Sequence, residues 1–516
     1  MSPWIAWSPE AFARAKAQGK PILAVRGPLP HESLKGAEGE ISSRFVAVLA
    51  DPETHPDAAA RLGADAVILD SDGARRAVLP LPSGELSSDL ARLAKDAAAP
   101  LTKGEPAPAW SGAVRDTAPP SAPDEAKISA VFAALNALPP EADPDLAAAL
   151  LHAAGERADA AARVSLAKAL EVRWAGWDPA RRAFLSGAGS PLALHARWAA
   201  VYWDAHALTG EARWREAAAA ASDHVLRLWD PAAGAFRRAA APEPAVYPAD
   251  GNALAASALL RAHAFGHPGS GEAGLKALNF LQTRLYDPLL GLQHSAGGAG
   301  ESVVGLLGDA AAAALAFTDG FLSTGMKTHR EFADAMLRFL FQELWDRDGG
   351  GFLDRVPRAG DPTILREPHL DPALNALALE ACRRLHHLKG NHNYRRWLEW
   401  GLQGAWKAKN GETRSLAGLA RVADMHARGR MDFELVGRSG ETKADALLAA
   451  VHRLYLPRKI ISFVDPDDQD YILAHRLEAE TYPRLFGCGA DLRRLADASD
   501  AAGVPAVAAA VRGEAG

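Results

Sequence analysis

Short apolar runs alternate with helical patterns over the first hundred residues. Three continuous apolar runs with β-branched members predict buried strands, at 21–25, 45–50 and 66–69. Helical patterns lie before, between and after them, at about 8–18, 56–62 and 87–98. The sequence Ser8-Pro9-Glu10 is a typical helix start. Strands that alternate with helices predict a small α/β unit with a covered sheet.

From about residue 125 to 425 the pattern becomes that of Ala- and Leu-rich helices, and a short motif recurs between them. Its copies are WDPARRAF from Trp177, WDPAAGAF from Trp229, YDPLLGLQ from Tyr286, WDRDGGGF from Trp345 and a weaker WKAKNGET from Trp406. The first four copies start roughly 55 residues apart, which fits two helices and their connections. The repeat predicts five or six stacked helical hairpins. They fit a closed α/α toroid, and an open solenoid is the alternative.

The remaining pattern sets the predicted domain boundaries. A Pro- and Ala-rich stretch predicts a linker. After the toroid, a strand at 431–436, a helix at 442–456 and a strand at 459–464 predict a βαβ-like appendage. The expected parts are an α/β domain at 1–98, a linker at 99–124, an (α/α) barrel at 125–428 and a βαβ-like C-terminal region at 429–516.

Composition narrows the possible functions. The chain has 516 residues, a formal net charge of −6 and 48% hydrophobic residues, so a nucleic-acid partner is not expected. No apolar run is long enough to span a membrane, and no leader pattern is visible, so we expect a cytoplasmic protein. The abundance of Ala, Arg and Pro is typical of a GC-rich bacterial genome. The only cysteines, Cys382 and Cys488, are too few for a disulfide framework or a Cys-based zinc site.

The order of these parts resembles the spermatogenesis-associated, thioredoxin-like protein family. The stretches that carry the resemblance are "WSPEAFARAKAQGKPILAV", "RFVAVLADPETHPD", "ELWDRDGGGFLDR", "LREPHLDPALNALALEACRRL" and "DFELVGR…LLAAVHRLYLPRKII". The resemblance implies a mainly α fold. A thioredoxin-like domain would be joined to an (α/α) barrel like those of six-hairpin glycosidases and N-acylglucosamine epimerases. The resemblance therefore predicts a fold but does not predict a particular reaction.

The sequence departs from this family where redox chemistry is expected. The family has a Cys-x-x-Cys ahead of a His-Glu-Ser segment, whereas here Pro28-Leu29-Pro30 precedes His31-Glu32-Ser33. The family's proline before the third strand is replaced by Gly63-Ala64-Asp65, and its C-terminal cysteines are absent from 504–510. Residues 1–97 contain no cysteine, and thiol exchange requires a thiolate. A thiol–disulfide oxidoreductase is therefore excluded for this domain.

The segments that precede the second helix of each hairpin border the funnel of a closed toroid, so candidate site residues are sought there. Sugar chemistry needs carboxylates or histidines for proton transfer, and aromatic, Arg or Asn side chains for hydroxyl groups. The candidate catalytic residues are Asp250, His369 and Asp371, and the candidate substrate-binding residues are Tyr247, Asn252, Arg366 and Asn375. The same segments contain His294, Glu301, Asp309 and Glu367. The run 366–371 is the densest and ranks first, although helix N-caps also prefer Asp and Asn.

Other motifs have simpler structural interpretations. The repeated Asp of the aromatic–Asp motif is ordinary turn chemistry. His386, His387 and His392 lack the spacing of a zinc site, so no metal or cofactor is expected. Cys488, between two glycines, is expected to be exposed and without a partner, and a redox role for it is the weakest option.

Two functional hypotheses remain. The first is a toroid that binds or processes a carbohydrate or other small molecule, as a hydrolase or an epimerase. The alternative is a non-catalytic scaffold that binds a protein partner through its thioredoxin-like domain.

Overall fold

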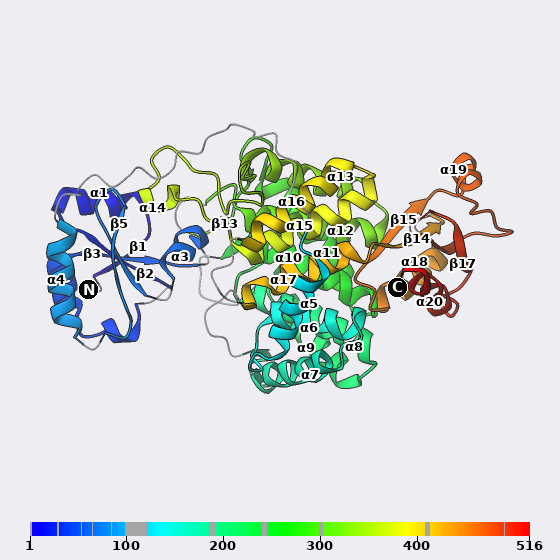
Figure 1. The fold of residues 1–516 in the computed structure, drawn as a ribbon, viewed down its shortest axis with the longest axis horizontal. Coiled ribbons are helices and arrows are strands. Elements are labelled where there is room, and N and C mark those ends of the chain that lie inside the picture. Colours follow the sequence, from blue (N-terminus) through cyan, green and yellow to red (C-terminus); the bar gives the residue numbers. More distant parts are fainter. Residues whose placement is uncertain are drawn as a thin grey trace. The chain divides into compact units, whose positions relative to one another are not determined.

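The computed structural model forms two compact units (Figure 1). It describes residues 3–27, 30–52, 54–63, 65–83, 85–98, 122–184, 191–239, 245–298, 303–407, 413–438, 440–489 and 491–515. Unit 1 comprises Met1–Val114, Glu301–Leu306 and Leu353–His369, and unit 2 comprises Arg115–Gly300, Leu307–Phe352 and Leu370–Gly516. Most of the predicted linker lies outside the described residues, as do Pro28 and Leu29 of the shortened loop.

Unit 1 is built on a five-stranded mixed sheet of order β1-β3-β2-β4-β5. Its strands are β1 (Trp4–Ala6), β2 (Ile22–Arg26), β3 (Val46–Ala50), β4 (Ala66–Leu69) and β5 (Arg75–Leu79). The first three strands in this order are parallel, and β4 and β5 are antiparallel to their neighbours. This sheet is compatible with the expected thioredoxin-like unit. The edge strands β1 and β5 were not predicted, because both are half-exposed and lack a continuous apolar run.

Helices cover both faces of this sheet. They are α1 (Pro9–Gln18), α2 (Glu38–Arg44), α3 (Pro56–Leu62), α4 (Leu86–Ala98) and the short α14 (Thr363–Arg366). Residues of α1 and α3 pack on one face and residues of α2 and α4 on the other. Consecutive residues Ile22 and Leu23 of β2 enter opposite cores, which explains the unbroken apolar run of this strand.

The segment Leu353–His369 is an integral part of unit 1. Ile364 and Leu365 of α14 are buried in the same core as α1 and α3. The buried Arg61 guanidinium of α3 donates to Asp354 Oδ2 and Oδ1 at 2.6 and 3.0 Å, and to the Glu367 carbonyl at 2.8 Å. This contact lies some 290 residues away in sequence, so no local pattern predicts it.

Unit 2 contains a closed ring of six inner helices. They are α6 (Pro144–Glu156), α8 (Pro191–Thr209), α10 (Ala249–Ala264), α12 (Leu307–Thr324), α15 (Pro372–Lys389) and α17 (Ala417–Ala427). Each inner helix contacts the next, and α17 contacts α6. The outer helices are α5 (Glu125–Asn136), α7 (Ala160–Ala175), α9 (Ala212–Arg227), α11 (Ser270–Phe280), α13 (Lys327–Phe339) and α16 (His392–Lys407). The closed toroid is thereby confirmed.

The repeated aromatic–Asp motif forms a tight β-hairpin before an inner helix. The paired strands are β6 (Trp177–Asp178) with β7 (Ala183–Phe184), β8 (Trp229–Asp230) with β9 (Ala235–Phe236), and β11 (Tyr286–Asp287) with β12 (Gly291–Leu292). In the fourth copy Trp345 bridges Phe352. Each motif Asp accepts backbone N–H groups of its own turn, as Asp178 does from Ala180 and Arg181. The turn interpretation of these carboxylates is confirmed.

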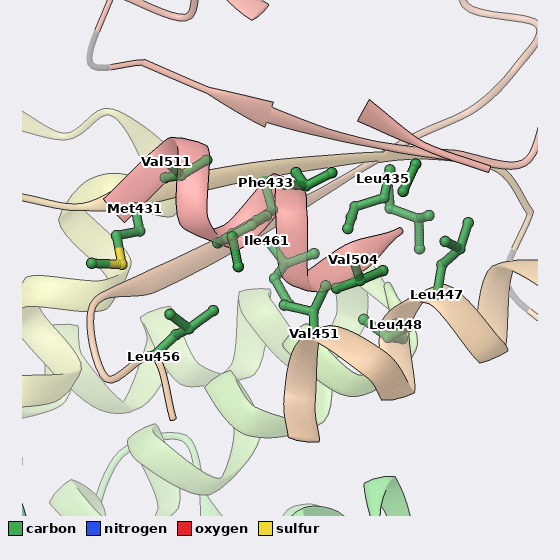
Figure 2. Packing of buried hydrophobic residues seen from close by; sticks show 14 of the residues in the cluster. Met431, Phe433, Leu435, Leu447, Leu448, Val451, Leu456, Ile461, Val504 and Val511 are labelled. Atoms are coloured by element: carbon green, nitrogen blue, oxygen red, sulfur yellow. The ribbon is translucent and has the colours of Figure 1, made fainter. Parts of the chain in front are cut away.

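The C-terminal part of unit 2 is a four-stranded sheet of order β15-β14-β16-β17. Its elements are β14 (Met431–Val436), α18 (Thr442–Arg453), β15 (Lys459–Val464), α19 (Gln469–Ala474), β16 (Arg484–Cys488), β17 (Arg494–Ala498) and α20 (Val504–Ala515). Strands β14 and β15 are parallel and joined by α18, which confirms the βαβ prediction. Figure 2 shows Phe433, Ile461, Val451 and Val504 in one core between this sheet, α18 and α20. Phe321 of α12 belongs to the same core, so the tail packs on the barrel.

Both cysteines are buried, contrary to the expectation for Cys488. Cys488 is 2% exposed in β16, where its thiol lies beneath α19, and burial raises its pKa to about 12. Its flanking glycines suggested a loop, but β16 continues through position 488. A buried thiol with a raised pKa is a poor nucleophile, so the redox option for Cys488 loses its support. Among the described residues, no helix has the length and apolarity needed to span a bilayer.

Candidate functional site

The site is assembled where a strand pair meets the starts of two inner helices. Strand β10 (Val246–Pro248) pairs with β13 (Ser295–Gly297), with Pro248 opposite Ser295. The Ala249 N–H donates to the His294 carbonyl at 2.7 Å. His294 therefore lies beside the first turn of α10, which carries Asp250. Asp309 comes from the first turn of α12, the next helix in the ring.

Asp250, His294 and Asp309 form one compact cluster. His294 Nδ1 is 2.9 Å from Asp309 Oδ1 and 3.1 Å from its Oδ2. One side-chain ligand atom from each residue lies within 4.8 Å of the others. His294 is 4% exposed and Asp309 is 1% exposed, whereas Asp250 is only half-buried. The cluster is therefore a buried His–Asp pair beside a more accessible carboxyl group.

The environment of Asp250 raises its pKa. Burial is the main cause, and the Asp309 carboxylate adds to the increase; His294 and the backbone N–H groups at the start of α10 oppose it. One of these N–H groups, that of Gly251, donates to Asp250 Oδ1 at 2.6 Å. On the neighbouring inner helices, Arg197 pairs with Asp145, and Arg197 also interacts electrostatically with Asp250. Asp250 is protonated to a higher pH than an ordinary Asp.

This arrangement suits proton transfer. The bond to Asp309 favours the tautomer in which His294 Nδ1 carries the proton and Nε2 holds the lone pair. Asp250 in its protonated form is a proton donor, and His294 is a base whose imidazolium Asp309 stabilises. The same three groups could instead hold one metal ion, because a carboxylate that orients a histidine is also typical of metal sites.

Tyr247 bonds to the neighbouring hairpin. Its hydroxyl donates to Asp230 Oδ2 at 2.7 Å. Arg237 pairs with the same oxygen at 2.7 Å. Together these bonds lower the pKa of Asp230 to about 2. Tyr247 thus links β10 to the turn that begins at Trp229.

Asn252 and Asn375 occupy equivalent positions and are fully buried. Asn252 Oδ1 accepts the Phe236 N–H at 2.7 Å, and its Nδ2 donates to the carbonyls of Phe236 and Pro248 at 3.0 and 2.8 Å. Asn375 makes the same set of bonds to Phe352 and to the Asp371 carbonyl. Each amide joins an inner helix to the hairpin before it.

The run 366–371 divides between the two units. Arg366 is exposed at the end of α14, and the backbone carbonyl of His369 accepts the Asp354 N–H at 3.0 Å; both residues belong to unit 1. Asp371 lies in unit 2 as the N-cap of α15, where its Oδ1 accepts the N–H groups of Ala373 and Leu374. Glu301 lies outside the described residues.

Sequence reasoning included His294 and Asp309 among the funnel residues but ranked them below the denser run 366–371. The distinguishing signal for Asp309 was present: it is the only charged residue at the start of a long Ala-rich helix. The position of His294 depends on the pairing of β10 with β13, which no local pattern reveals.

Several solved glycoside hydrolases are similar to this chain. An α-mannanase of family GH76 from Bacteroides thetaiotaomicron is 11% identical, covering 56% of this chain and 86% of its own, with a TM-score of 0.46. The family 105 hydrolase of C. acetobutylicum ATCC 824 is 9% identical, covering 57% and 97%, with a TM-score of 0.47. An α-1,6-mannanase of Salegentibacter sp. HEL1_6, in complex with α-1,6-mannotriose, is 12% identical, covering 58% and 98%, with a TM-score of 0.46. No protein-family model and no curated protein matches the sequence.

Proposed function

We propose that unit 2 is a carbohydrate-processing enzyme whose reaction takes place at Asp250, His294 and Asp309. The carrying observation is that Asp250 and Asp309, at the starts of two neighbouring inner helices, converge with His294, and that the three side chains lie within 4.8 Å of one another. Two proton-transfer groups with different environments are what the hydrolysis of a glycosidic bond requires. We also propose that the chain is a divergent member of the spermatogenesis-associated, thioredoxin-like protein family, which its sequence resembles.

Each member of the cluster has a distinct role in the proposed reaction. Protonated Asp250 donates its proton to the leaving glycosidic oxygen, as its raised pKa favours. Because Asp250 and His294 lie in one cluster, His294 takes a proton from a water molecule that attacks the oxocarbenium-like anomeric carbon from the face that the leaving group has vacated. Asp309 orients the imidazole and stabilises its positive charge, as the 2.9 Å bond to Nδ1 permits.

The experiment is a reducing-end assay over a panel of α- and β-linked disaccharides and oligosaccharides, with epimerisation of N-acylhexosamines followed in parallel. Asp250→Asn and His294→Ala should each lower kcat by at least a hundredfold, in the range expected for general acid–base groups. Asp309→Asn should lower kcat while leaving KM similar, because it changes the tautomer and not the contacts with the sugar. Asp348→Asn, at an exposed hairpin position, is the matched control.

Two results would count against this assignment. If no sugar of the panel is turned over or shifts the melting temperature, the scaffold alternative is favoured. If activity depends on an added divalent cation and is abolished by a chelator, the cluster acts as a metal site and Asp250 is not the free acid.

For unit 1 we propose a role without redox chemistry. All cysteines of the chain lie in unit 2, so unit 1 has no thiol to exchange. Insulin-reduction assays of the full chain should therefore show no more turnover than the buffer.

A further inference from the structure

A cavity lies inside the barrel, towards the C-terminal ends of the inner helices. Its volume is about 220 Å³. All six inner helices contribute to its wall, through Leu151, Asp204, Arg261, Asp319, Arg384 and Arg421. The cavity is therefore centred on the barrel axis.

This cavity is separate from the Asp250 cluster. Asp250 and Arg261 both lie on α10, eleven residues apart, which is about 16 Å along the axis at 1.5 Å per residue. Asp309 and Asp319 on α12 are about 15 Å apart by the same measure. A monosaccharide cannot contact both ends at once.

The tail forms the roof of the cavity. The roof residues are His452 at the end of α18, Tyr455 in the segment after it, and Lys459 at the start of β15. Arg458, next to Lys459, pairs with Glu156 of α6 at 2.7 Å, and both side chains are buried. Arg453 of α18 donates to the Ala264 carbonyl of α10 at 2.6 Å. Together with the apolar core in Figure 2, these bonds fix the roof on the barrel.

The carboxylates of the wall are already paired. Arg261 binds Asp204 at 2.6 Å. Arg384 binds Asp319 at 2.6 Å and Glu380 at 2.7 Å. Each carboxylate of the wall therefore already has an arginine as its ion-pair partner.

Two cationic side chains of the wall have no such partner. Among the described residues, the side chains of Arg421 and Lys459 make no hydrogen bond or ion pair. Arg261 Nη1 is also buried without a hydrogen-bond partner. Arg421 interacts electrostatically with Glu380, and burial together with Arg261 and Arg384 lowers the pKa of Lys459 to about 7. An oxyanion in the cavity would add hydrogen-bond acceptors for these donors and favour the charged form of Lys459.

We propose that this cavity binds a small molecule bearing an oxyanion, either a phosphate ester or a carboxylate, through Arg421, Lys459 and Arg261 Nη1. Guanidinium groups recognise both oxyanions with paired N–H donors. The paired carboxylates Asp204 and Asp319 provide acceptors for hydroxyl groups. The volume fits a ligand of the size of one sugar ring or less.

The test is thermal unfolding and calorimetric titration of the full chain. Inorganic phosphate, glucose 6-phosphate and glucuronate are the probes, and sodium chloride at equal ionic strength is the reference. At least one oxyanion should give a saturable rise in melting temperature that chloride does not give. The phosphate and glucuronate arms distinguish the two oxyanion classes, and Asp250→Asn should bind the same probe unchanged.

Variants separate binding from folding. Arg421→Met and Lys459→Met should each weaken binding of that probe at least tenfold, while the exposed Arg215→Met should bind as the wild type does. Without the probe, the two cavity variants should keep the wild-type circular dichroism spectrum and a cooperative melt, because neither side chain makes a hydrogen bond or ion pair within the described part of the folded chain, so weaker binding is not caused by unfolding. Absence of saturable binding by all three probes would overturn the proposal. So would wild-type affinity in both cavity variants.

Discussion

Replacing Asn252 or Asn375 by alanine should destabilise the barrel rather than only weaken substrate binding. Each amide is 0% exposed and makes three hydrogen bonds to backbone groups of a hairpin and a helix start. Truncation leaves one N–H and two carbonyls without this partner in a buried site.

The expected loss follows from these bonds. A buried donor left unpaired costs about 1–3 kcal/mol, and each carbonyl adds less because it keeps a second lone pair for other donors. The total is about 3 kcal/mol for each variant. Unit 2 has roughly 380 residues, so its unfolding entropy of about 0.8 kcal/mol/K converts this loss to a fall of about 4 °C in melting temperature.

Circular dichroism melts and urea titrations of Asn252→Ala and Asn375→Ala measure this directly. The two variants should fall by similar amounts, since their bonding sets match. Asn252→Asp should be at least as unstable, because a carboxylate cannot donate to the two carbonyls. The exposed Asn279→Ala is the control. Stability within 0.5 kcal/mol of the wild type in both alanine variants would refute the reasoning.

Three further predictions concern other parts of the chain. Burial, aided by the Asp432 charge, raises the pKa of Glu434 to about 7, so the folded state should lose stability as pH rises from the ordinary glutamate range to about 7, and the loss should level off above that. Between pH 5 and 8 the wild type should lose on the order of 2 kcal/mol more than Glu434→Gln in urea titrations, and equal slopes would contradict this. Arg61→Met leaves Asp354 buried without its partner and should cost unit 1 about 3–5 kcal/mol in thermal melts, whereas Lys16→Met, at an exposed pair, should change nothing. Cys488 should not react with a thiol reagent in the native protein, because its side chain is buried. Rapid labelling would contradict this and show that the thiol is accessible to solvent.

Local patterns in the sequence carry much of this fold. The Ser8 cap of α1 accepts the Ala11 N–H, as the sequence predicts, and the aromatic–Asp copies mark the hairpins of the barrel. These features depend on neighbouring residues alone. The half-exposed strand β5 has no such signature and was missed.

The site and the extent of unit 1 depend on contacts distant in sequence. The run 366–371 ranked first as a candidate site because polar residues are dense there. Its first four residues belong to unit 1, because Arg61 and the buried residues of α14 hold that segment in the core of unit 1. His294 reaches Asp250 through the pairing of β10 with β13. Neither the contacts of Arg61 nor the pairing of β10 with β13 can be predicted from the order of residues along the chain.

The most direct measurement is a crystal structure of the Asp250→Asn variant with the panel sugar that most raises its melting temperature. The account predicts a glycosidic oxygen within hydrogen-bond distance of residue 250, with His294 on the same face of the sugar ring and close to the anomeric carbon. A sugar bound elsewhere in unit 2, or a metal ion bound by His294 and Asp309 with no sugar near it, would contradict the account.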